Sequence, residues 1–127
     1  MKTIDLKNSL VRAISMVGLF GISYWLCRFI FFDMHGMKSW PNTLAMVGLT
    51  IIVVATIYRN HIIPVATLVG YMGGFILAMI FNTDGIDPGG GGTNNAWIIW
   101  GTVFIFSILI GIILGLISKQ RYKNTKV

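Results

Sequence analysis

Four long runs of apolar residues are separated by short polar stretches. The runs cover approximately 11–32, 42–58, 62–81 and 96–118. A membrane-spanning helix needs about 20 apolar residues, and roughly 17 to 25 are tolerated. The runs are apolar on every face and lack the alternation of a barrel strand. The pattern therefore predicts an all-α integral membrane protein, a bundle of four transmembrane helices joined by short loops.

The polar stretches contain residues that end and begin helices. Residues 59–61 are so few that the runs on either side must form a tight antiparallel hairpin, with Pro64 in the first turn of the second run. The longest stretch, 82–95, holds four consecutive glycines, which disfavour a helix. Asn94 or Asn95 at its end can cap the last helix. We expect a single membrane domain over 1–127.

Composition agrees with a membrane protein. The chain has 127 residues, of which 55% are hydrophobic and 11% charged, whereas soluble domains contain about 25% charged residues. These values exclude an ordinary soluble enzyme, a disordered segment and a disulfide-stapled module. The abundance of Ile, Lys and Asn is typical of a low-GC bacterium, so we expect the plasma membrane of a bacterium.

The basic residues predict an orientation. Four spans place both termini and residues 59–61 on one side, which would carry Lys2, Lys7, Arg12, Arg59, Lys119, Arg121, Lys123 and Lys126. The other side would carry Lys38 and Arg28. Because basic residues collect in cytoplasmic segments, we expect cytoplasmic N- and C-termini, with 119–127 as a basic tail near anionic lipid. Basic residues placed between apolar runs do not indicate a nucleic-acid partner.

Aromatic residues mark the predicted boundaries and the interior. Trp25, Trp40, Trp97 and Trp100 all fall toward the outer boundary, where tryptophan rings favour the headgroup level. Tyr71 lies in the middle of the third run, and we expect its hydroxyl to hydrogen-bond a neighbouring helix.

Small residues recur at helical spacing and predict packing faces. They are Ala66, Gly70, Gly74 and Ala78 in the third run, Ser107, Gly111 and Gly115 in the fourth, and Gly18 and Gly21 in the first. Membrane helices associate where small residues let their backbones approach closely. These rows predict either packing of the four helices within one bundle or self-association through the outer face of one row.

Chemistry-bearing residues are few. All four acidic residues are aspartates, and Asp5, Asp33, Asp84 and Asp87 fall outside the predicted spans. An ionisable group within the membrane usually marks a transport or proton pathway. Because no catalytic constellation or cofactor motif is present, we expect neither an enzyme nor a cofactor.

Arg28 is the one charged residue well inside an apolar run. Its long side chain can reach the lipid phosphates at the outer surface. It can also form a salt bridge with Asp33 or Asp84. The functional alternative is contact with an anion or substrate at the outer mouth of a cavity.

The stretch 82–95 is rich in oxygen-bearing side chains. Asn82, Asp84 and Asp87 are spaced as in parts of calcium-binding loops, but no closing bidentate glutamate follows. They form a weak candidate Ca²⁺ site. The alternative is a polar, flexible connector or a partner-docking loop, because Asp-Gly and Asp-Pro pairs mark turns.

These features favour an accessory, regulatory or immunity-type membrane component without catalytic activity. We expect it to act by helix–helix contacts within the lipid bilayer, with another membrane protein or with itself. The alternative is a homo-oligomeric channel or carrier for a small solute or ion, with its pathway between subunits.

Overall fold

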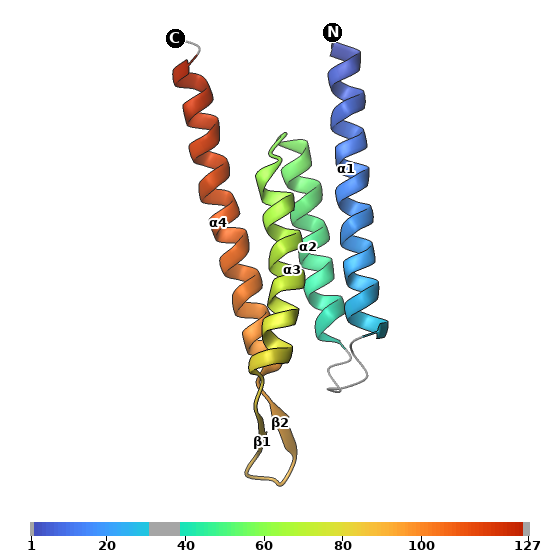
Figure 1. Cartoon of the computed structure of the whole chain (residues 1–127), viewed down its shortest axis with the longest axis vertical. Coiled ribbons are helices and arrows are strands. Elements are labelled where there is room, and N and C mark those ends of the chain that lie inside the picture. The colour runs from blue at the N-terminus through green and yellow to red at the C-terminus, as the bar shows by residue number, and fades with distance from the viewer. Residues whose placement is uncertain (1, 31–38, 126–127) are drawn as a thin grey trace.

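The computed structural model describes residues 2–30 and 39–125. Its elements in chain order are α1 (Lys2–Trp25), a π-helical segment η1 (Leu26–Ile30), α2 (Trp40–Ile57), α3 (Ile62–Phe81), β1 (Asp84–Ile86), β2 (Gly92–Asn94) and α4 (Ala96–Thr125). Four helical segments in the described part are long and apolar enough to cross a membrane. Figure 1 shows the helices side by side, with both chain ends at one end of the bundle and the two strands at the other. The predicted four-helix membrane bundle is confirmed.

The first and last helices are longer than the apolar runs. α1 begins at Lys2, and α4 continues to Thr125, so 119–125 extends α4 instead of forming a separate tail. This segment contains no glycine or proline, and its lysines and arginine favour a helix. The 30 residues of α4 rise about 45 Å, more than the hydrocarbon core of about 30 Å. Both helices therefore project beyond the α2–α3 turn (Figure 1). Residues 31 and 32 of the first run lie outside the described residues.

The turn between α2 and α3 is closed by its own backbone. The Arg59 N–H donates to Thr56 O and the Asn60 N–H to Ala55 O, both at 2.9 Å, which is the pattern of a Schellman motif. Arg59 has a φ of 54°, a left-handed conformation that glycine adopts with less strain. The Asn60 side-chain oxygen accepts the Ile62 N–H at 2.9 Å, so it caps α3. The turn therefore holds Arg59 in a defined place.

The stretch 82–95 contains an antiparallel hairpin and is not merely a flexible connector. β1 pairs with β2, with Gly85 opposite Thr93. At the tip, the Asp87 carboxylate accepts the backbone N–H groups of Gly89 at 2.9 Å and Gly91 at 2.8 Å. The glycines thus bring their amides close to one carboxylate, which closes the turn.

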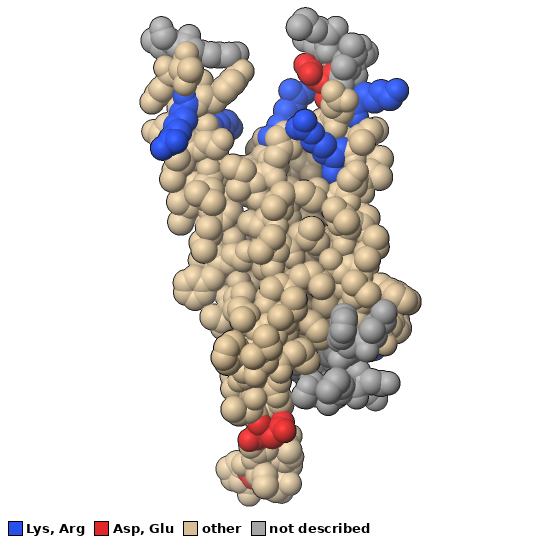
Figure 2. Space-filling view, viewed as in Figure 1, with Lys and Arg blue, Asp and Glu red and all other residues tan. Residues whose placement is uncertain are grey.

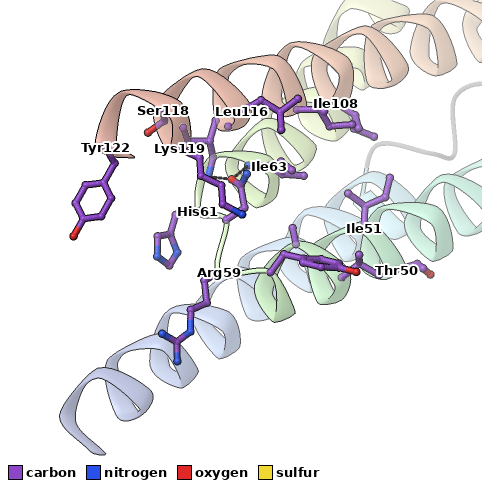
Figure 3. Close-up of a pocket in the computed structure, with 17 residues that line it drawn as sticks. Thr50, Ile51, Arg59, His61, Ile63, Ile108, Leu116, Ser118, Lys119 and Tyr122 are labelled. Carbon is purple, nitrogen blue, oxygen red and sulfur yellow. Dashed lines mark hydrogen bonds between the residues drawn. The ribbon is translucent and has the colours of Figure 1, made fainter. Parts of the chain in front are cut away.

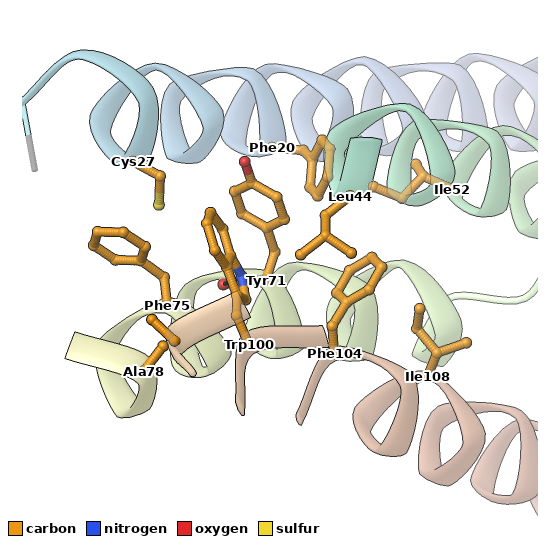
Figure 4. Close-up of a cluster of buried hydrophobic side chains, with 11 residues drawn as sticks. Phe20, Cys27, Leu44, Ile52, Tyr71, Phe75, Ala78, Trp100, Phe104 and Ile108 are labelled. Carbon is orange, nitrogen blue, oxygen red and sulfur yellow. Dashed lines mark hydrogen bonds between the residues drawn. The ribbon is translucent and has the colours of Figure 1, made fainter. Parts of the chain in front are cut away.

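Tyr71 of α3 lies at the centre of the core (Figure 4). It is fully buried, and its ring centroid lies 5.0 Å from that of Phe20, 5.2 Å from that of Trp100 and 6.1 Å from that of Phe104. Its hydroxyl donates to Pro41 O of α2 at 3.2 Å, as expected from the sequence. The Trp100 indole N–H donates to Tyr71 O at 2.8 Å. This one residue therefore connects all four helices.

The four tryptophans do not form one belt at the headgroup level. Trp25 and Trp97 are about half exposed, but Trp100 is fully buried. The Trp40 ring meets the Trp97 ring edge-on at 5.6 Å and covers Gly101. The prediction was wrong for Trp100 because the contact between α3 and α4 turns its side chain into the core.

The outside of the bundle is strongly apolar. Large exposed apolar side chains on α4 include Ile105, Phe106, Leu109, Ile110 and Ile113. Soluble proteins rarely expose continuous apolar surface of this kind. The outer faces of the helices therefore contact the lipid bilayer.

Candidate functional site

The row of small residues on α3 lies directly against α4. A Cβ added at Gly70 would lie 2.6 Å from Ser107 Cβ, and one added at Gly74 would lie 2.8 Å from Trp100 Cδ1. Ser107 also donates its hydroxyl to Ala66 O at 2.7 Å. Close backbone approach and an interhelical hydrogen bond are the two features that hold membrane helices together.

The row on α4 continues this contact. A Cβ added at Gly111 would clash with the Ala66 side chain, and one added at Gly115 would clash with the Asn60 side chain. Ala78 is fully buried at the other end of α3. Seven of the nine small residues singled out in the sequence therefore lie inside the bundle.

Gly18 and Gly21 of α1 differ from the other seven. No described atom outside their own helix backbone lies within 4 Å of a Cβ added at either position. Gly21 lines a cavity of about 480 Å³ between α1 and α2, together with Val17, Phe20, Tyr24, Asn42, Ala45, Met46 and Leu49. We call this the α1/α2 groove. The Tyr24 hydroxyl donates to the Asn42 side-chain oxygen at 2.6 Å beside it.

A larger cavity opens between α2 and α4 at the end that holds the termini. Its volume is about 1010 Å³. Figure 3 shows its lining, which includes an apolar wall of Ile51, Val54, Ile108, Ile112 and Leu116 and a polar mouth with Arg59, His61 and Lys119. We call this the α2/α4 groove. It exists because Trp40 holds the starts of α2 and α4 together, whereas the other end of α4 diverges from the bundle (Figure 1).

The charges of the molecule are divided between its two ends. Figure 2 shows most of the visible Lys and Arg side chains at the end with the termini, where Asp5 lies in the first turn of α1, and acidic side chains on the hairpin at the other end. The residues that line the α2/α4 groove include Arg59 and Lys119 but no Asp or Glu. The mouth of this groove is therefore electropositive.

Arg28 lies in η1, at the opposite end of the bundle from that groove. Its guanidinium carbon is 5.6 Å from the centre of the Phe29 ring, within the range of a cation–π contact. Asp33, one of its two expected salt-bridge partners, lies outside the described residues. The carboxylate of the other, Asp84, accepts a hydrogen bond from Asn94 at 2.6 Å.

The candidate calcium ligands are occupied by hydrogen bonds within the hairpin. The Asn94 amide donates to the side-chain oxygens of Asn82 at 3.2 Å and Asp84 at 2.6 Å. The Asp87 carboxylate instead binds the amides at the hairpin tip. Asn94 also accepts the Ala96 N–H at 2.8 Å, which caps α4 as predicted. These hydrogen bonds order the hairpin, and the candidate Ca²⁺ site stays a prediction.

The geometry describes a multi-pass membrane protein with a tightly packed α3–α4 pair and lateral grooves, among them the α1/α2 groove and the α2/α4 groove. Comparison with known protein families, curated proteins and solved structures finds no match for this chain.

Sequence reasoning missed the α2/α4 groove. The sequence predicts an orientation from Arg59 and Lys119 and lipid contact for the tail that begins at Lys119, but no shared cavity. The one available signal was that both fall at the same predicted membrane boundary. Their convergence on one cavity depends on the angle at which α4 leaves the bundle, which no local pattern encodes.

Proposed function

We propose that this protein is a non-catalytic accessory, regulatory or immunity-type membrane component that binds a helix of another membrane protein. The observation that carries the proposal is the open surface at Gly18 and Gly21 beside the α1/α2 groove. Glycine within a helix costs about 1 kcal/mol relative to alanine. At Gly70 and Gly74 that cost is offset by contact with α4. On α1, the contact of a partner helix would supply the same compensation.

The polar pair beside these glycines supports the same proposal. Tyr24 and Asn42 join α1 to α2 at the groove, and the Asn42 side chain is exposed. The Asn42 amide can donate a further hydrogen bond to a backbone carbonyl of a partner helix. Such bonds between membrane helices contribute roughly 0.6 kcal/mol on average. Small residues and one polar group therefore favour a helix as the occupant.

The proposal is tested by photo-crosslinking from the groove. A photoreactive residue at Met46, which lines the α1/α2 groove, should give an adduct with a membrane protein that mass spectrometry identifies. The same residue at Val69, an exposed position on α3, should not. Gly21→Ile should reduce the Met46 adduct at least tenfold because the added side chain keeps the partner backbone away.

Gly73→Ile is the matched control. Gly73 also has no described atom within 4 Å of an added Cβ, but it lies on α3. The adduct should persist in this variant. Equal yields of adduct from photoreactive residues at Met46 and Val69 would contradict the proposal. An adduct between two copies of this chain would instead indicate self-association.

We also propose that the end with the termini is cytoplasmic. The α2–α3 turn lies at that end (Figure 1), and most basic side chains gather there (Figure 2). Short basic segments remain on the cytoplasmic side of a membrane. In a Cys27→Ala background, an impermeant maleimide should label Thr93→Cys in intact cells and Asn124→Cys only after permeabilisation. The reverse pattern would invert the orientation.

A further inference from the structure

We propose that the α2/α4 groove binds one phospholipid with an anionic headgroup. An acyl chain lies along the apolar wall, and the phosphate contacts Arg59 and Lys119 at the mouth. This site is separate from the α1/α2 groove of the proposed function and does not depend on a protein partner.

The groove has the depth of one leaflet. Its wall on α4 includes Ile108, Ile112 and Leu116, and its mouth includes Lys119. α4 rises about 16 Å from Ile108 to Lys119. Half of the hydrocarbon core measures about 15 Å. An acyl chain along this wall therefore places its headgroup at the level of Lys119.

The charges at the mouth complement a phosphate. Arg59 and Lys119 come from different elements and line the same cavity as His61, and all three side chains are exposed. Arginine and lysine are the side chains that bind phosphate oxygens in proteins. The left-handed backbone of Arg59 places this side chain in a turn where glycine would be less strained. Basic pockets between membrane helices on the cytoplasmic side bind anionic headgroups.

The division of the lining into an apolar wall and a polar mouth favours a lipid over a transported solute or a helix. Thr50 is a polar residue along the wall. Its hydroxyl donates to Met46 O of its own helix at 2.9 Å, so this hydrogen bond is made within the protein. An ion or small solute would need polar groups along its path. A transmembrane helix would extend past the mouth of the groove. A phospholipid would end at the mouth, because its charged headgroup is at one end of the molecule.

The test measures which lipid the purified protein retains. The protein is extracted with a mild detergent from vesicles that contain equal amounts of phosphatidylglycerol and phosphatidylcholine, and native mass spectrometry counts the bound lipids. We expect one retained phosphatidylglycerol. Arg59→Gly and Lys119→Gln should each lower the ratio of bound phosphatidylglycerol to phosphatidylcholine about fivefold, because each basic residue contributes about 1 kcal/mol near an anionic lipid.

Arg59→Gly removes the charge and relieves the left-handed backbone, so a lost lipid would not reflect a disrupted turn.

Lys123→Gln makes the same charge change as Lys119→Gln on the same helix, but Lys123 is outside the groove lining. The Lys123→Gln variant should bind phosphatidylglycerol and phosphatidylcholine in the same ratio as the unmodified protein. Equal retention of both lipids, or equal losses in the Lys119 and Lys123 variants, would overturn the proposal.

A second pair of variants tests the apolar wall. Val54→Trp should fill the groove and reduce the retained phosphatidylglycerol at least fivefold. Val53→Trp should not, because Val53 is similarly exposed but lies outside the lining. Unchanged retention in Val54→Trp would overturn the proposal. So would a photoreactive residue at Ser118 that captures a protein helix in place of a lipid.

Discussion

Replacing Gly70 with leucine is expected to destabilise the folded protein by about 3 kcal/mol, the upper end of the usual cost of overpacking a core. The first added carbon would lie 2.6 Å from Ser107 Cβ and 3.3 Å from the backbone oxygen of Phe104. Backbone cannot move aside as a flexible side chain can, so α3 and α4 must separate. Separation also breaks the hydrogen bond of 2.7 Å from Ser107 to Ala66. Reversible unfolding in mixed micelles measures the change.

Gly73→Leu is the control for this prediction. It makes the same substitution three residues further along α3, where no described atom lies within 4 Å of an added Cβ. This substitution should not destabilise the protein, because leucine favours a helix over glycine by up to about 1 kcal/mol and the added Cβ has open space. Equal destabilisation by both variants would show that the cost comes from α3 itself and not from its contact with α4.

Tyr71→Ala is expected to destabilise the protein by about 3–5 kcal/mol, the range for removing a large aromatic side chain from a core. Lipid is as apolar as the core, so the loss comes mainly from packing contacts and less from transfer out of water. The ring lost from the centre contacts the rings of Phe20, Trp100 and Phe104. The same unfolding measurement applies.

Tyr71→Phe separates packing from hydrogen bonding. It keeps the ring and removes only the hydroxyl that donates to Pro41 O at 3.2 Å. Side-chain hydrogen bonds between membrane helices average about 0.6 kcal/mol, so this variant should be almost as stable as the unmodified protein. A loss as large as that of Tyr71→Ala would mean that the hydrogen bond, and not ring packing, holds α2 against α3.

The four spans were predictable because membrane insertion depends on local properties. A run such as 62–81 crosses the membrane by virtue of its length and the transfer free energies of its own residues. The row at Gly70 and Gly74 was predictable for a similar reason, since spacing alone places small residues on one face of a helix. The cap at Asn94 also follows from a local rule.

The hairpin was not predictable from its strands. The segments Asp84–Ile86 and Gly92–Asn94 have three residues each, without the alternation of apolar and polar residues that marks a strand. Their pairing depends on side-chain hydrogen bonds, from Asn94 to Asp84 and from the tip amides to Asp87. Apolar patterning carries no information about such bonds.

The sequence by itself determined the number of helices and the placement of both termini and the α2–α3 turn at one end. Each of these follows from properties that a segment has alone. Only the tertiary structure decided that Trp100 faces the core, that Gly18 and Gly21 remain open, and that Arg59 and Lys119 line one groove. Within lipid, an apolar residue gains little from being inside or outside the bundle. The inward face is therefore chosen by contacts between residues far apart in the chain, and these exist only once the helices have packed.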